Sequence, residues 1–121
     1  MTGTALSPLR IVVAAHFHQR LLGWMGRRHF PVNEGLLLNP CNAVHGFFMR
    51  APIDVVFLDR FASVVRVQAL QPWHTARCRR AHMTLELAHG AFVRIGPDAV
   101  ERSVARALYR GSRSTFARER R

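Results

Sequence analysis

Apolar positions fall in short runs along most of this chain, and their spacing predicts a succession of strands. Alternating or β-branched runs are typical of strands, because successive side chains of a strand point to opposite faces. The predicted strands cover residues 9–15, 36–38, 43–49, 53–59, 63–70, 82–88 and 91–95. Residues 59–62 are the expected hairpin turn, and residues 72–80 are expected to form an irregular basic loop.

Two segments show helical spacing instead. A short helix is predicted over residues 16–28, ending near Gly26, because four apolar residues recur on one helical face: Phe17, Leu21, Trp24 and Met25. A second helix is expected over residues 99–110, followed by a frayed Ser/Arg-rich end at 111–121.

The balance of elements predicts a mainly β fold, a compact β-sandwich or barrel with one short helix near its start and a possible C-terminal helix. A chain of 121 residues forms one domain. We expect residues 1–8 to be a loose leader, residues 9–98 to form the β domain, and residues 99–121 to be a basic C-terminal helix or tail.

The charge of the chain is strongly positive and concentrated at its C-terminal end. There are 18 basic residues, all of them arginine, against 7 acidic residues, which gives a net charge of +11. The last twenty residues contain seven arginines and one glutamate, so they carry +6 of that charge. Such a tail is either a solvated end or an electrostatic arm that binds nucleic acid.

Other features narrow the class of protein. No apolar run approaches the roughly 18–20 residues that span a bilayer, and no signal peptide is predicted, so we expect a cytoplasmic protein without membrane attachment. Cys41 and Cys78 are the only cysteines and are expected to be free thiols. The spacing of Cys41 and His45 is compatible with zinc, but no CxxC pair supports it, so neither a metal nor a cofactor is predicted.

Residues 44–59 hold the most informative stretch, in which two apolar runs flank a proline and form an expected strand–turn–strand. Arg50 and Asp54 lie on either side of Pro52. In a structural interpretation, Asp54 accepts backbone N–H bonds across the turn or pairs with Arg50. In a functional one, Arg50 presents its guanidinium to an anionic or hydroxylated ligand in a pocket bordered by Phe47 and Phe48.

Two further positions are candidates for binding. Glu86 lies between two leucines, either on a solvent face or reaching an arginine in a cleft; with Asp54 it could form an acid–base pair of the glycosidase kind. Trp73 follows Pro72 in the basic loop, either as a stacking platform for a sugar ring or nucleobase or folded over the rim of the domain. The predicted binding residues are His45, Phe48, Arg50, Asp54, Trp73 and Glu86.

Several ordered blocks resemble the domain of unknown function 192 family of small prokaryotic proteins. The blocks are GWMGR at 23–27, EGLL at 34–37, HGFFMRAPIDVVFLD at 45–59, PW at 72–73 and LELAHG at 85–90. The resemblance covers roughly residues 10–98 and implies a jelly-roll-like β-sandwich with a short helix near its start. It implies no particular activity. Gly46 replaces the small polar residue that relatives often place there, and the arginine tail lies beyond the shared region.

The function expected from these features is that of a non-catalytic accessory module that binds a small ligand or a partner protein. Aromatic and charged residues are gathered on a small scaffold, while no nucleophile elbow or phosphate-binding glycine loop is present in the sequence. Two alternatives remain open at this point: a nucleic-acid-associated protein that uses the arginine tail, and an enzyme acting on carbohydrate-like substrates.

Overall fold

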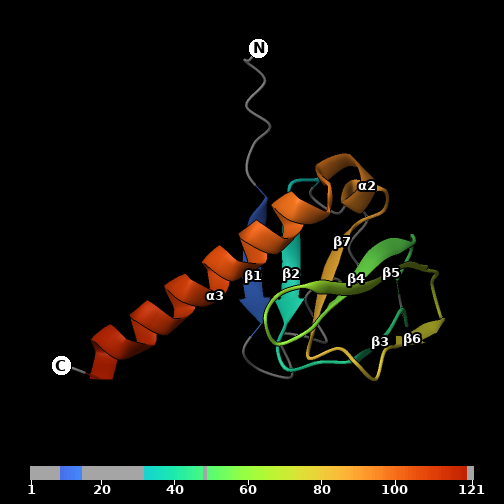
Figure 1. Ribbon diagram of the computed structural model, residues 1–121. Coiled ribbons are helices and arrows are strands. Elements are labelled where there is room, and N and C mark those ends of the chain that lie inside the picture. The colour runs from blue at the N-terminus through green and yellow to red at the C-terminus, as the bar shows by residue number, and fades with distance from the viewer. Residues whose placement is uncertain (1–8, 15–31, 48, 120–121) are drawn as a thin grey trace, which may run out of the picture.

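The structure, a computed structural model, describes residues 9–14, 32–47 and 49–119. The leader at 1–8 and the helix predicted over 16–28 therefore lie outside the described residues. The described part is mainly β, with two helices towards the C-terminal end of the chain (Figure 1).

The main element is a five-stranded sheet with the strand order β1-β2-β7-β4-β5. Its strands, in that order, are Arg10–Ala14, Glu34–Leu38, Met83–Ala88, Ile53–Leu58 and Val64–Leu70. Only β1 and β2 run parallel, and every other neighbouring pair is antiparallel. A second sheet pairs β3 (Ala43–His45) with β6 (Thr75–Arg77). Because β1 and β5 remain edge strands, the barrel form of the predicted fold is wrong.

Both faces of the large sheet are covered. Every residue of β4 and β7 is buried, and alternate side chains of β4 enter two different hydrophobic clusters. The first cluster holds Val55 and Phe57 together with residues of the small β3–β6 sheet. The second holds Val56 and Leu58 together with residues of the long C-terminal helix. The small sheet and the helix thus form the two outer layers (Figure 1).

The segment Ala91–Ile95 forms helix α2, so its prediction as a strand is wrong. A short apolar run looks the same in a buried strand and in a helix, so periodicity does not separate them. Here Gly90 and Gly96, with φ angles of 85° and 93°, set the chain direction on either side. Of the helix residues only Ala91 is buried, whereas Val93 is 87% exposed.

Helix α3 spans Pro97–Glu119, which is longer than the predicted 99–110. Proline suits a helix start because its missing N–H has no partner to lose there. Val100 and Val104 are fully buried against the sheet, and the helix then continues through the segment that was expected to fray. Within the described part of the chain, neither helix is long and apolar enough to cross a membrane.

The stretch 44–59 does not form a paired strand–turn–strand, which corrects the prediction. Strand β3 pairs with β6, which lies inside the segment predicted as an irregular loop, while β4 lies between β7 and β5. The hairpin from β4 to β5 is confirmed. At its turn one carboxylate oxygen of Asp59 accepts the N–H groups of Phe61 and Ser63, at 2.9 and 3.0 Å.

Matched valine substitutions test this packing. Val104→Ala removes two buried methyl groups beneath α3 and should lower the free energy of unfolding by about 2 kcal/mol. Val93→Ala, in exposed helix α2, should leave it unchanged or raise it by up to about 0.5 kcal/mol, because alanine is the better helix former. Urea unfolding of both variants measures the difference; equal losses would contradict α2 as an exposed helix.

Candidate functional site

The predicted binding residues lie in three places of the fold. His45 ends β3 of the small sheet and Trp73 lies just before β6, while Asp54 and Glu86 lie on the adjacent inner strands β4 and β7 of the large sheet. Arg50 is exposed on the connection between β3 and β4. Phe48 lies outside the described residues.

Three aromatic rings form a row on the surface, here called the aromatic ladder: His45, Phe47 and Trp73. The ring centroids of His45 and Phe47 are 4.6 Å apart, with an interplanar angle of 33°. Phe47 and Trp73 are stacked at 5.8 Å and 29°. Phe47 is 39% exposed and Trp73 is 58% exposed, so the ladder presents ring surface to solvent.

Backbone pairing holds the ladder together. The Gly46 N–H donates to the His74 carbonyl, and the Trp73 N–H donates to the Gly46 carbonyl, both at 2.8 Å. A Cβ atom on Gly46 would lie 2.7 Å from the carbonyl oxygen of Gln71, so only glycine fits where the two segments cross. Trp73 has a φ of 68°, in the left-handed region that large residues rarely adopt. The surrounding hydrogen bonds therefore keep a bulky side chain in a conformation that costs about 1 kcal/mol or more.

The surroundings of the ladder are positive. The segments that build it, 35–53 and 60–85, contain no aspartate or glutamate. Arg50 lies three residues after Phe47, and Arg77 ends the strand that pairs with β3; both are exposed. The charged residues that neighbour the ladder in the sequence are therefore basic and not acidic.

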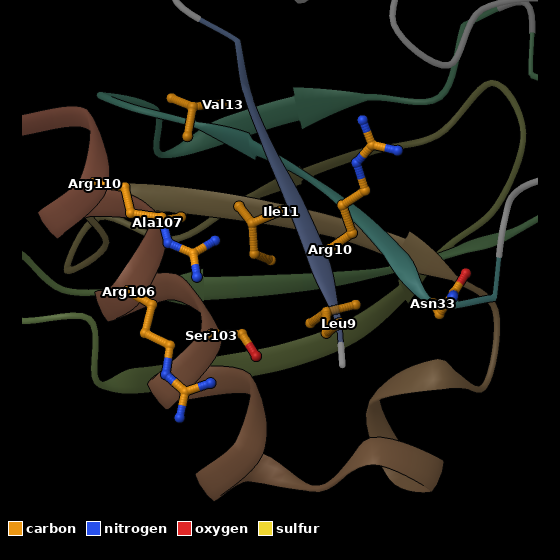
Figure 2. Close-up of a pocket in the computed structure, with 9 residues that line it drawn as sticks. All are labelled: Leu9, Arg10, Ile11, Val13, Asn33, Ser103, Arg106, Ala107 and Arg110. Carbon is orange, nitrogen blue, oxygen red and sulfur yellow. The ribbon is translucent and has the colours of Figure 1, made fainter. Parts of the chain in front are cut away.

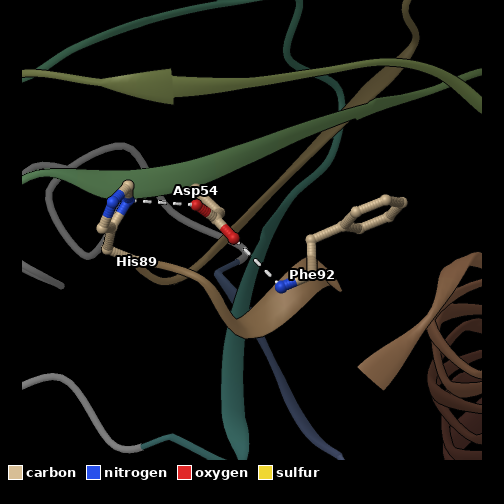
Figure 3. Close-up of polar contacts among 3 residues, drawn as sticks. All are labelled: Asp54, His89 and Phe92. Atoms are coloured by element: carbon tan, nitrogen blue, oxygen red, sulfur yellow. Dashed lines mark hydrogen bonds and ion pairs between the residues drawn. The ribbon is translucent and has the colours of Figure 1, made fainter. Parts of the chain in front are cut away.

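Asp54 has its polar partners at the start of helix α2 (Figure 3). One carboxylate oxygen lies 3.3 Å from Nδ1 of His89, and the other accepts the backbone N–H of Phe92 at 3.0 Å. Asp54 is buried, whereas the side chain of His89 is about half exposed. The carboxylate thus ties the start of β4 to α2, and the side chain beside it is His89 rather than Arg50.

Glu86 is buried in apolar surroundings. Its register partners on the neighbouring strands are Leu36 and Val55, and only 8% of the residue is exposed. Its carboxyl group makes no hydrogen bond or ion pair within the described part of the chain. Burial raises the pKa of Glu86 to about 8, because ionisation would place a charge among apolar side chains. At neutral pH this side chain is therefore a protonated carboxylic acid.

Asp54 and Glu86 do not form an acid–base pair. Directly opposed residues of an antiparallel pair share a face; Asp54 opposes Leu87, and Glu86 opposes Val55. Leu87 and Val55 belong to the two different hydrophobic clusters, so the two carboxyl groups point to opposite sides of the sheet. The pairing considered from the sequence is therefore excluded by the register.

The residues weighed as zinc ligands are engaged separately. The Cys41 thiol donates to the Ala43 carbonyl at 3.2 Å, and His45 Nδ1 accepts the Phe47 N–H at 3.3 Å. Both cysteines are buried free thiols. Among residues 9–14, 32–47 and 49–119, no three His, Cys, Asp or Glu side chains are placed to share a metal ion.

Sequence reasoning missed two contributions to these places. Phe47 was expected only at the border of a pocket, but it is the middle ring of the aromatic ladder. His89 was not among the predicted binding residues, although its Nδ1 lies 3.3 Å from the carboxylate of Asp54. The turn at His89-Gly90 follows β7 directly, and only the pairing of β7 with β4 places it beside Asp54.

The buried carboxyl of Glu86 predicts a pH dependence of stability. The folded protein holds this proton up to about pH 8, whereas the unfolded chain loses it near 4.5. The contribution of Glu86 to the free energy of unfolding should therefore be largest below pH 4.5 and fall as the pH rises towards 8. Glu86→Gln, which stays neutral, should remove this fall and stabilise the protein at pH 7 by up to about 3 kcal/mol.

Urea unfolding at about pH 5 and about pH 9 makes the comparison for both proteins. At the lower pH the two should differ little, because Glu86 is then protonated in the native state. Parallel losses of stability in the wild type and the Gln variant would show that other groups cause the pH dependence.

Sequence comparison places the chain among relatives. The DUF192 family model, described as "Uncharacterized ACR", matches residues 1–100. A UPF0127 protein of Pyrococcus horikoshii is 34% identical over 97 residues, which is 76% of each chain. A UPF0127 protein of Pyrococcus abyssi is 36% identical over 69 residues, 53% of this chain; the match spans 57% of that relative's length.

Two solved structures share the fold. One is a protein of unknown function from Novosphingobium aromaticivorans, with a TM-score of 0.64, 19% identity and coverage of 73% of this chain and 69% of the other. The other is a Sinorhizobium meliloti protein described as a candidate transcription regulator, with a TM-score of 0.62, 21% identity and coverage of 71% and 73%. At these identities the likeness concerns the fold alone. The family model covers most of the chain and includes both central strands, and this protein therefore belongs to the DUF192 family.

Proposed function

We propose that this protein is a non-catalytic binding module that takes a ring-bearing, negatively charged ligand on its aromatic ladder. The ring is a sugar or a nucleobase. The observation that carries the proposal is the stacked pair of Phe47 and Trp73, which are 39% and 58% exposed and whose charged neighbours in the sequence are basic.

Stacking supplies the first part of the binding energy. A base on an exposed aromatic side chain is worth about 1–3 kcal/mol, and sugar rings also pack on tryptophan through their apolar faces. The Trp73 backbone is already fixed by its hydrogen bond to Gly46 and its left-handed conformation. Little conformational freedom of the backbone would then be lost on binding, which favours affinity.

Charge supplies the second part. The two segments around the ladder contain no acidic residue, and Arg50 is exposed close to it in the chain. A guanidinium group pairs well with a carboxylate or phosphate and can bind both oxygens at once. A nucleotide or an acidic sugar therefore fits the ladder better than a neutral ring.

Binding without turnover is favoured because neither acidic group of the inner strands is set up for acid–base catalysis at the ladder. Asp54 is occupied by His89 and by the backbone of α2, on the face of the sheet opposite to the small sheet. Glu86 is buried between apolar strands and protonated at neutral pH. Neither carboxyl is arranged with the other to activate a water or a leaving group.

Trp73→Ala tests the proposal directly. Two charged probes, AMP and glucuronic acid, are titrated calorimetrically, and their neutral counterparts, adenosine and glucose, are titrated in parallel. The wild type should bind at least one of the charged probes. Loss of the stacking surface should weaken that binding by about tenfold or more. Arg50→Gln should lower the affinity for the charged probe and leave the affinity for its neutral counterpart unchanged.

Phe61→Ala is the matched control, because it removes an aromatic ring that is 80% exposed on the β4–β5 turn, away from the ladder. Its affinity should equal that of the wild type. If no probe binds, or if the Trp73 and Phe61 variants lose affinity equally, the ladder is not a ring-binding site.

Helix α3 supports a second candidate, nucleic-acid association through the basic C-terminal segment. Because the helix continues to Glu119, the arginines from Arg102 to Arg118 lie on a helix rather than in a frayed tail. Arg102, Arg106 and Arg110 recur every four residues and therefore lie along one side of the helix; all three are exposed. Evenly spaced cations of this kind match the repeating charge of a phosphate backbone.

Salt dependence tests this candidate. If the arginine row binds phosphates, replacing Arg102, Arg106 and Arg110 with glutamine should reduce the slope of log affinity against log salt by about 2–3 for DNA or RNA. Fluorescence anisotropy with a labelled oligonucleotide at several salt concentrations measures the slope. A slope that stays the same after the triple substitution would remove α3 from any nucleic-acid interface.

A further inference from the structure

A groove of about 680 Å³ runs between strand β1 and helix α3 (Figure 2). Its apolar wall comes from Ile11 and Val13 on β1 and from Leu9 just before it, with Ala107 contributed by α3. It lies at the β1 side of the molecule, whereas the aromatic ladder belongs to the β3–β6 sheet at the other end (Figure 1). The groove is therefore a separate surface from the ladder.

The groove follows an open edge of the large sheet. Strand β1 is the last strand of that sheet and pairs only with β2 among the described strands. Arg10 lines the groove together with its neighbours Leu9 and Ile11, although successive side chains of a strand point to opposite faces. The groove therefore runs along the edge of β1 and not only over one face of it. Such an edge presents backbone N–H and C=O groups to an added strand.

The charge of the groove is positive. Arg10, Arg106 and Arg110 line it, and none of the described residues that line it is acidic. Figure 2 shows Arg106 and Arg110 on the α3 side of β1, and Arg10 on the other side. Glu34 lies opposite Arg10 in the β1–β2 register, whereas Arg106 and Arg110 lie on α3 at the groove itself. The occupant that complements this surface carries negative charge on the side that faces α3.

We propose that this groove binds an extended acidic peptide of a partner protein, which adds a strand beneath helix α3 to the edge of β1 that no described strand pairs with. Main-chain hydrogen bonds to β1 would supply affinity, and alternate side chains would supply specificity. Acidic residues would face Arg106 and Arg110. The residues between them would be apolar and would lie beside Val12, which is 38% exposed on the opposite face of β1.

A second copy of this chain is a poor occupant. Self-pairing through β1 would bring Arg10, Arg106 and Arg110 of both copies together with no acidic lining residue to offset them. Like charges placed together across an interface oppose association. The charge of the groove thus favours a partner of different composition.

The test uses the full chain and a labelled, end-capped peptide that alternates aspartate and valine. Fluorescence anisotropy should show saturable binding of this peptide, and none of the same peptide with lysine for aspartate. The double substitution Arg106→Gln/Arg110→Gln should weaken binding by about tenfold or more, because each lost ion pair with an extended chain removes part of the affinity.

Two controls separate strand addition from simple charge attraction. Arg102→Gln removes an exposed arginine of the same helix outside the groove and should leave affinity nearly unchanged. Methylation of every second peptide nitrogen removes the N–H donors along one edge of the peptide without changing its charge. Two such peptides can be made, one for each edge. The peptide that lacks the donors facing β1 should no longer bind.

Equal losses from the Arg102 substitution and the double substitution, or binding that survives every methylation pattern, would overturn the proposal. The proposal would also be overturned if Arg106 and Arg110 bound an oligonucleotide and the aspartate–valine peptide did not bind. The two arginines would then act on the helix surface and not in the groove. Arg106 and Arg110 are exposed, so circular dichroism should show that the variants keep the fold of the wild type.

Discussion

Burial of strands β4 and β7 on both faces is the constraint on which the remaining structure depends. Every residue of these strands is buried, and their alternate side chains enter two separate hydrophobic clusters. A sheet that is apolar on both sides requires a covering layer on each side. Helix α3 forms one layer and the β3–β6 sheet contributes to the other. Both proposed binding surfaces are built on these layers: the ladder on the small sheet, and the groove beside α3.

The same constraint decides the chemistry of the two central carboxyl groups. Asp54 and Glu86 come from adjacent strands, yet a register offset of one residue points them to opposite faces. Asp54 lies near the start of its strand and reaches His89 and the backbone of α2, so its carboxylate has polar partners. Glu86 lies between Leu36 and Val55 and has only apolar register partners, so burial keeps it protonated. Neighbouring carboxyl groups therefore serve different purposes.

Features of the fold that depend on local pattern could be predicted from the sequence, and those that depend on neighbours could not. The hairpin from β4 to β5 follows from two apolar runs around a turn residue whose carboxylate binds nearby N–H groups. Strand β6 was missed because three residues in a basic loop become a strand only when β3 pairs with them. Segment Ala91–Ile95 is too short for its apolar pattern to distinguish a helix from a strand. The helix is favoured by the positive φ of the glycine on each side and by the hydrogen bond from the Phe92 N–H to Asp54.

For the candidate site, the sequence determined the residue types and the tertiary structure decided which of them meet. Composition and the motif blocks identify the family, the mainly β class and the positive charge, because these properties depend on local pattern and on counts. Trp73 is separated from His45 by more than twenty residues, and only the β3–β6 pairing joins them through Phe47. The register likewise separates the carboxyl groups of β4 and β7. Contacts between distant segments are set by sheet order and pairing, which no local pattern encodes.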